Sequence, residues 1–108
     1  MKLAFTYPNA TTLVLKPTES RVLDPALFES LLEQISSSSR TNVILDMSGI
    51  KYIDSMTLGM LVTLARTLKF QGQEFSIANP ESQIMETFHV TQLNILISTV
   101  PLPDTSPA

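Results

Sequence analysis

The residues best placed to do chemistry lie in the segment YIDSMTLGML (52–61), where Asp54, Ser55 and Thr57 interrupt an aliphatic stretch. The apolar residues that follow recur at helical spacing, so we expect a helix to begin near Ser55. A carboxylate or hydroxyl at that point can cap the helix by accepting a backbone N–H bond. A hydroxyl there can also carry a phosphate, which the free N–H groups and the helix dipole would tolerate. The two roles are compatible, and these residues alone leave both open.

Catalysis by Ser55 would require a general base, and the sequence offers a poor candidate. The single histidine, His89, lies near the predicted end of a later helix, and no G-x-S-x-G motif surrounds the serine. A phosphate-accepting receiver domain would need an acidic pair after its first strand, and KLAFTYPNA contains none. The chain has no cysteine, which excludes disulfides and thiolate metal sites. We therefore predict a protein that is not an enzyme, with no catalytic residues, no metal site and no cofactor.

Composition predicts one compact domain. The chain has 108 residues, of which 44% are hydrophobic and 16% charged. Its formal net charge of -3 provides no basic surface for nucleic acid or anionic lipid. No segment has the apolar length of a signal peptide or a membrane span, so we expect a cytoplasmic protein without direct membrane insertion. We expect a single domain over residues 1–100 and, because three prolines follow closely, a flexible tail over 101–108.

The elements that must position Ser55 are short strands alternating with helices. KLAFTY (2–7) and TTLVLK (11–16) predict a hairpin, and NVILDM (42–47) predicts a central strand buried on both faces. Asp24 and Pro25 should open a helix that ends at SSSS, and the helix from Ser55 should stop before Gly72. EFSIAN (74–79) predicts a strand, Asn79-Pro80 the cap of a third helix, and NILIST (94–99) a last strand. The fold class is α/β: a mixed sheet of about four or five strands with helices packed against it.

The helix that begins at Ser55 has two unlike faces. At 100° per residue, one face must pack on the sheet, and it consists of Leu58, Leu61, Val62, Ala65 and Leu68. The opposite face consists of Met56, Gly59, Met60, Thr63, Thr67 and Phe70. These methionines and phenylalanine either belong to a helix buried all round or form an adaptable contact surface for a partner. The expected core of the domain is Val43, Ile44, Leu45, Leu58, Leu61, Ala65, Leu68 and Ile77.

The segment from Asn42 to Asn79 resembles the core of a STAS domain, the fold of bacterial anti-sigma-factor antagonists. The resemblance rests on a buried strand ending in Leu45-Asp46, on Asp54-Ser55 followed by Leu58-Gly59, and on Gly72 before the next strand. HVTQLNILIS (89–98) is similar to the passage from the last helix to the last strand in that family. Many antagonists read Asp-Ser-Ser-Gly-Leu-Gly, whereas this chain places Met56 and Thr57 after the serine. The bulky side chain of Met56 therefore lies next to Ser55.

The resemblance implies a partner-switching regulator. In the antagonists, a serine kinase that is also the anti-sigma factor phosphorylates the matching serine, and a PP2C-type phosphatase removes the phosphate. By position, the acceptor is Ser55, with Thr57 as its rival and with Asp46 and Asp54 flanking the site. The partner would bind the exposed helix face, namely Met56, Gly59, Met60, Thr63 and Phe70. The alternative is a non-phosphorylated STAS subunit of a lipid-transport complex or a signalling scaffold.

Overall fold

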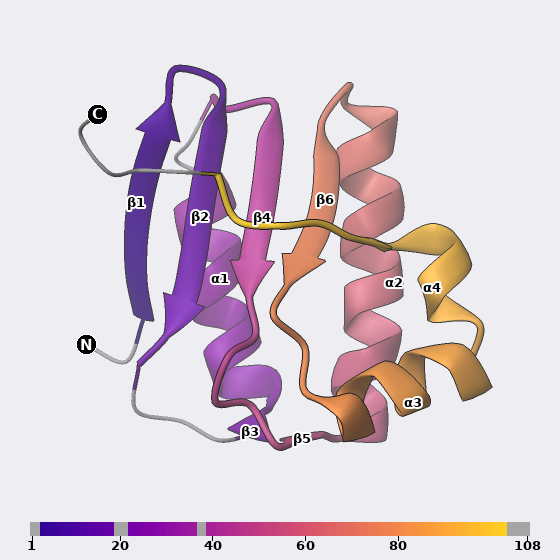
Figure 1. Cartoon of the computed structure of the whole chain (residues 1–108). Helices are drawn as coiled ribbons and strands as arrows, with labels where there is room; N and C mark the ends of the chain where they lie inside the picture. The colour runs from indigo at the N-terminus through magenta and orange to yellow at the C-terminus, as the bar shows by residue number, and fades with distance from the viewer. Residues whose placement is uncertain (1–2, 19–21, 37–38, 104–108) are drawn as a thin grey trace.

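A five-stranded sheet forms the frame of the molecule (Figure 1). The computed structural model describes residues 3–18, 22–36 and 39–103. In sheet order, the strands are β1 (Leu3–Asn9), β2 (Thr12–Pro17), β4 (Asn42–Asp46), β6 (Glu74–Ala78) and β7 (Ser98–Thr99). β1 is antiparallel to β2, and the other neighbouring strands are parallel. The predicted α/β class and mixed sheet are therefore confirmed.

The two long helices cover one face of this sheet. They are α1 (Pro25–Ser36) and α2 (Ser55–Phe70), and both begin at the same end of the molecule (Figure 1). The shorter helices α3 (Ser82–Val90) and α4 (Leu93–Leu96) lie beside α2. Among the described residues, no helix is long and apolar enough to cross a membrane.

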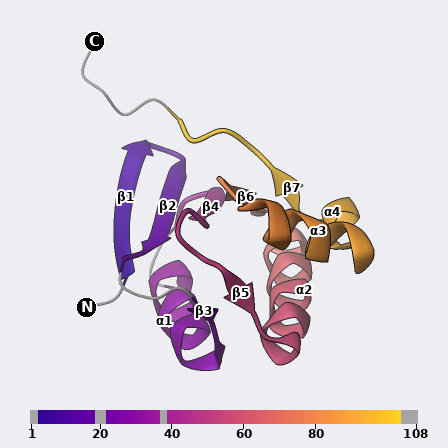
Figure 2. The same cartoon turned by 60° about the horizontal axis from the view of Figure 1, so that its bottom comes forward.

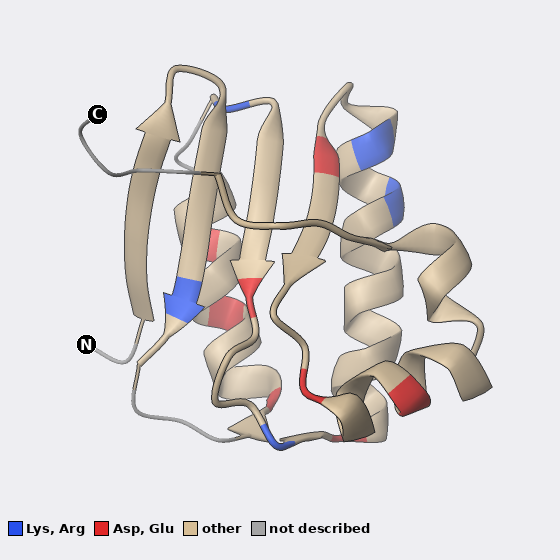
Figure 3. Ribbon diagram, viewed as in Figure 1, with Lys and Arg blue, Asp and Glu red and all other residues tan. Residues whose placement is uncertain are grey.

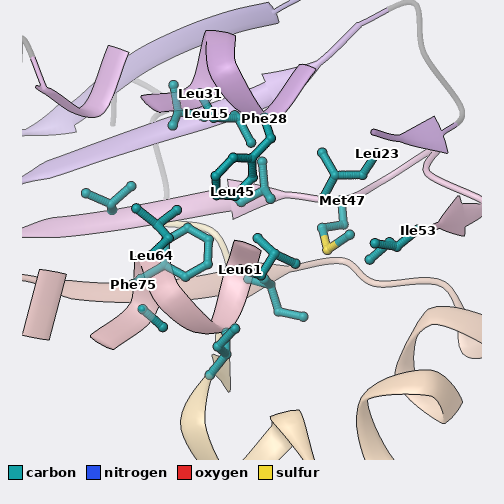
Figure 4. Close-up of a cluster of buried hydrophobic side chains, with 14 of the residues drawn as sticks. Leu15, Leu23, Phe28, Leu31, Leu45, Met47, Ile53, Leu61, Leu64 and Phe75 are labelled. Carbon is teal, nitrogen blue, oxygen red and sulfur yellow. The ribbon is translucent and has the colours of Figure 1, made fainter. Parts of the chain in front are cut away.

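The main core lies between the sheet and the two long helices. Leu45 on β4 and Ile77 on β6 meet Leu61 from α2, and all three are fully buried. Figure 4 shows Leu15, Leu45 and Phe75 from the sheet converging with Phe28 of α1 and Leu61 of α2. β4 is buried on both faces, as predicted, because Ile44 points to a second cluster on the opposite face of the sheet.

α2 begins and ends as the sequence predicts. Asp54 caps its first turn, and Gly72 follows its last turn with a φ of 80°. At that end the Gln73 N–H donates to the Leu68 carbonyl at 2.8 Å, which closes the helix around the left-handed glycine.

The buried face of α2 is rotated from the predicted one. Leu61, Ala65 and Leu68 are buried as expected, but Leu58 and Val62 are only partly buried. Thr57 and Leu64 are buried instead. The reason is that α1 packs beside α2 and covers the Leu64 side, which a helical projection of α2 alone cannot include.

The third helix and the last strand also differ from prediction. α3 begins at Ser82 with Glu81 at its N-cap position, so Asn79-Pro80 is not its cap. Asn79 adopts a left-handed backbone (φ 53°) and donates from Nδ2 to Asp46 Oδ1 at 3.3 Å. The predicted strand over 94–99 begins as the helical turn α4, and only Ser98–Thr99 pairs as a strand.

The other face of the sheet is covered by the chain that follows β7. Val100 packs on Val14, Ile44 and Ala78, and its N–H donates to the Ile77 carbonyl at 2.9 Å. Figures 1 and 2 show this segment crossing the sheet on the side opposite α1 and α2. Residues 101–103 continue along the same face, where Leu102 and Pro103 line a small hollow. The flexible tail expected over 101–108 stays a prediction, since residues 104–108 lie outside the described chain.

Candidate functional site

The N-termini of α1 and α2 lie side by side at one end of the molecule (Figure 2). A small parallel sheet joins them, formed by β3 (Val22–Leu23) and β5 (Tyr52–Ile53), with Leu23 opposite Ile53. Asp24 and Asp54 follow these two strands directly, one before each helix. The sequence analysis missed this pairing because two-residue strands have no periodicity to detect.

Both aspartates cap their helices in the same way. Asp54 Oδ1 accepts the Thr57 N–H at 2.7 Å, and Asp24 Oδ1 accepts the Leu27 N–H at 2.9 Å. The nearby Thr57 side chain, and then the Thr57 backbone N–H, hold the pKa of Asp54 below its ordinary value, against a smaller opposing effect of desolvation. Asp54 is therefore an ionised cap at neutral pH.

Ser55 and Thr57 differ completely in access to solvent. Ser55 is the first residue of α2 and is exposed. Thr57 is fully buried, and its hydroxyl has no hydrogen-bond partner among the described residues. The Thr57 hydroxyl thus lowers the pKa of the Asp54 carboxyl by lying close to it, although the two groups do not have the geometry of a hydrogen bond. Of these two hydroxyl-bearing residues, only Ser55 is open to solvent.

Asp46 is positioned by contacts of its own. It is buried at the end of β4, and its Oδ1 accepts from the Ser48 N–H at 3.0 Å and from Asn79 Nδ2. These bonds connect the loop that follows β4 to the loop that follows β6. They do not involve Asp54 or Ser55, so a role for Asp46 beside the acceptor stays a prediction.

The predicted contact surface is mostly exposed. Met56 is 67% exposed and Phe70 is 94% exposed, and Gly59 and Thr63 are also exposed. Met60 is the exception: it is partly buried and packs against the core, because the covered face of α2 extends toward α1. The prediction that Met60 is largely solvent-accessible is therefore wrong.

An open apolar groove runs between α1 and α2, beginning next to Ser55. Its volume is about 400 Å³, and its lining residues are Phe28, Leu32, Met56, Gly59, Met60, Thr63, Leu64 and Thr67. Phe28 and Leu64 form its buried floor. The sequence analysis identified the α2 wall but missed the α1 wall, because only tertiary packing places the two helices side by side. Phe70 is not part of the groove.

Catalysis by His89 and binding of a metal ion both lack support at this site. His89 lies exposed in the last turn of α3, an element separate from the start of α2. Within residues 3–18, 22–36 and 39–103, no group of three or more histidine, aspartate or glutamate side chains could hold a metal ion.

Solved structures share this fold. The unphosphorylated form of the anti-sigma factor antagonist SpoIIAA matches with a TM-score of 0.72 and 17% identity, over 94% of this chain and 89% of that one. The NMR structure of TM1081 also gives 0.72 and 17%, over 90% and 78%. The Bacillus cell fate determinant SpoIIAA in its phosphorylated form gives 0.69 and 17%, over 94% and 92%.

The family model agrees with the architecture. The STAS domain model matches residues 24–106, from the cap of α1 through both long helices and past β7. This match extends well beyond the segment around Ser55. The chain belongs to the STAS domain family.

Proposed function

We propose that this protein is a partner-switching regulator of the anti-sigma-factor antagonist type, controlled by reversible phosphorylation of Ser55. A serine kinase that is also the binding partner transfers the γ-phosphoryl group of ATP to Ser55 Oγ. A PP2C-type phosphatase hydrolyses the resulting phosphoserine. This chain is the substrate of both enzymes and contributes no catalytic group.

The observation that carries the proposal is the position of the Ser55 hydroxyl. It is exposed at the first residue of α2, and the next residue, Met56, begins the apolar groove. A phosphate at this position meets the positive end of the α2 dipole, because Ser55 is the first residue of that helix. The folded state therefore tolerates the modification, while a partner seated over Met56 must meet the added charge.

The added charge acts mainly on the complex. Phosphate contributes about -1.5 to -2 charges at neutral pH. A partner that places an apolar surface over Met56 must remove this charge from water. A loss of about 1.4 kcal/mol in binding free energy weakens binding tenfold, so a modest cost of covering the phosphate suffices for a switch.

The fold of SpoIIAA supports the idea that phosphate leaves the domain intact. Both its unphosphorylated and its phosphorylated forms resemble this chain over nearly the same share of residues. At 17% identity this likeness concerns the fold, and the partner must be found by experiment.

Phosphosite mapping after incubation with the cognate kinase and ATP tests the proposal. We expect label on Ser55 and none on Thr57, because the Thr57 side chain is inaccessible unless the first turn of α2 opens. Ser55→Ala should lose the label and bind the kinase constitutively, and Thr57→Ser should keep it on Ser55. Label on Thr57 alone would show that Thr57, and not Ser55, is the phosphorylated residue. Absence of label from both would contradict the proposal and favour a non-phosphorylated STAS subunit.

A further inference from the structure

The groove between α1 and α2 has the shape of a helix-binding site. Its α2 wall runs from Met56 to Thr67, a distance of about 17 Å or three helical turns. A second hollow continues it toward the ends of both helices and shares Leu32, Leu64 and Thr67 with it. Amphipathic helices bind in grooves of this kind by inserting apolar side chains spaced at i, i+3, i+4 and i+7.

The charges around the groove are unevenly distributed. Among the described residues, none that lines the groove is charged. Glu29 and Glu33 are the only charged residues of α1; both are exposed and line a hollow that shares Leu32 with the groove. The only charged residues of α2, Arg66 and Lys69, lie in its second half (Figure 3).

We propose that the α1–α2 groove binds a basic amphipathic helix of the partner, with its apolar side chains in the groove and its cations along Glu29 and Glu33 of α1. The inference rests on the proposed function in one respect: the helix belongs to the partner whose binding Ser55 controls. Phosphate on Ser55 acts directly at one end of this groove. The phosphate would lie beside Met56, where the helix inserts apolar side chains, so binding must cover this charge without a cationic partner and is weakened.

The methionine methyl groups provide the readout for a direct test. Met56 and Met60 line the groove, whereas Met47 is buried in the core and Met85 lies on α3. The full unphosphorylated chain, labelled with ¹³C at its methionine methyl groups, is titrated with a synthetic amphipathic helical peptide. The peptide has leucines at i, i+3, i+4 and i+7 and lysines elsewhere, and its control carries glutamate in place of each lysine.

The lysine peptide should shift the Met56 and Met60 resonances saturably and leave Met47 and Met85 in place. The glutamate peptide should bind about tenfold more weakly, and salt should reduce the difference. Exchanging the charges with Glu29→Lys and Glu33→Lys should reverse the preference. Gly59→Trp should block binding, because a Cβ at Gly59 meets no atom within 4 Å and the indole can fill the groove. If that variant does not fold, Thr63→Arg serves the same purpose, and Gln83→Arg, exposed on α3, is the matched control.

Absence of Met56 and Met60 shifts with either peptide would overturn the groove as a binding site. Equal binding of both peptides would overturn the basic character of the occupant. Because this experiment uses neither kinase nor phosphate, its failure leaves the Ser55 switch standing. Conversely, peptide binding in this experiment together with no label on Ser55 in the phosphosite mapping would retain the groove and reject the switch.

Discussion

At the scale of single residues, three neighbouring positions have three separate tasks. Asp54 caps α2, Ser55 presents a free hydroxyl, and Thr57 fills the space beneath the cap. The sequence places all three correctly at the helix start but cannot rank the two hydroxyls. Both lie in the first turn, and only the packing of the core buries Thr57 while leaving Ser55 in solvent.

The Asp54 cap predicts a specific dependence of stability on pH. Its pKa in the folded protein lies below the value of about 3.9 in an unfolded chain, so the ionised carboxylate stabilises the fold above pH 4. This contribution disappears as the pH falls through the folded pKa. Asp54→Asn keeps an oxygen that can accept the Thr57 N–H but cannot titrate. Thermal unfolding between pH 7 and pH 2.5 should therefore show a smaller loss of stability for Asp54→Asn than for the wild type below pH 4. Parallel curves would show that Asp54 does not contribute.

At the scale of the elements, the orientation of α2 sets both the core and the contact surface. The start, the end and most of the buried residues of this helix follow from its sequence. The rotation of its buried face toward Leu64 does not, because it depends on α1 as a neighbour. The groove escapes prediction for the same reason: its two walls are separated by β4 and β5 in the chain, and only tertiary packing brings Leu32 near Met60.

The observed rotation of α2 can be tested by alanine substitution. Leu64→Ala removes a buried side chain and should cost about 2–5 kcal/mol of unfolding free energy, as should Leu61→Ala. Leu58→Ala should cost less than about 2 kcal/mol, because Leu58 is only partly buried. Chemical denaturation measures all three values. A larger cost for Leu58 than for Leu64 would restore the rotation predicted from the sequence and contradict the structure.

At the scale of the whole molecule, the sheet has two unlike faces. The helices build the large core on one face, and a short segment after β7 covers the small cluster on the other. The alternation of strands and helices predicts the α/β class. It does not predict that residues 100–103 cross the second face, because an irregular segment rich in proline has no pattern that specifies where it packs.

Two truncations distinguish the stability contributed by residues 100–103, which cover the sheet, from that contributed by residues 104–108. Removing residues 100–108 exposes Val14 and Ile44 and deletes the bond from the Val100 N–H, so the free energy of unfolding should fall. Removing only residues 104–108 keeps this cover and should leave the thermal midpoint unchanged, as the predicted flexible tail requires. Equal midpoints for both truncated chains would show that the cover contributes nothing to stability.

The central claim is that phosphate on Ser55 changes binding without changing the fold. Its most direct test is the affinity of the partner kinase for the chain carrying phosphoserine at position 55, compared with the unmodified chain. We predict an affinity at least about tenfold lower for the phosphorylated chain, with the same thermal midpoint and the same core resonances in both forms. Equal affinities for two equally folded forms would contradict the account.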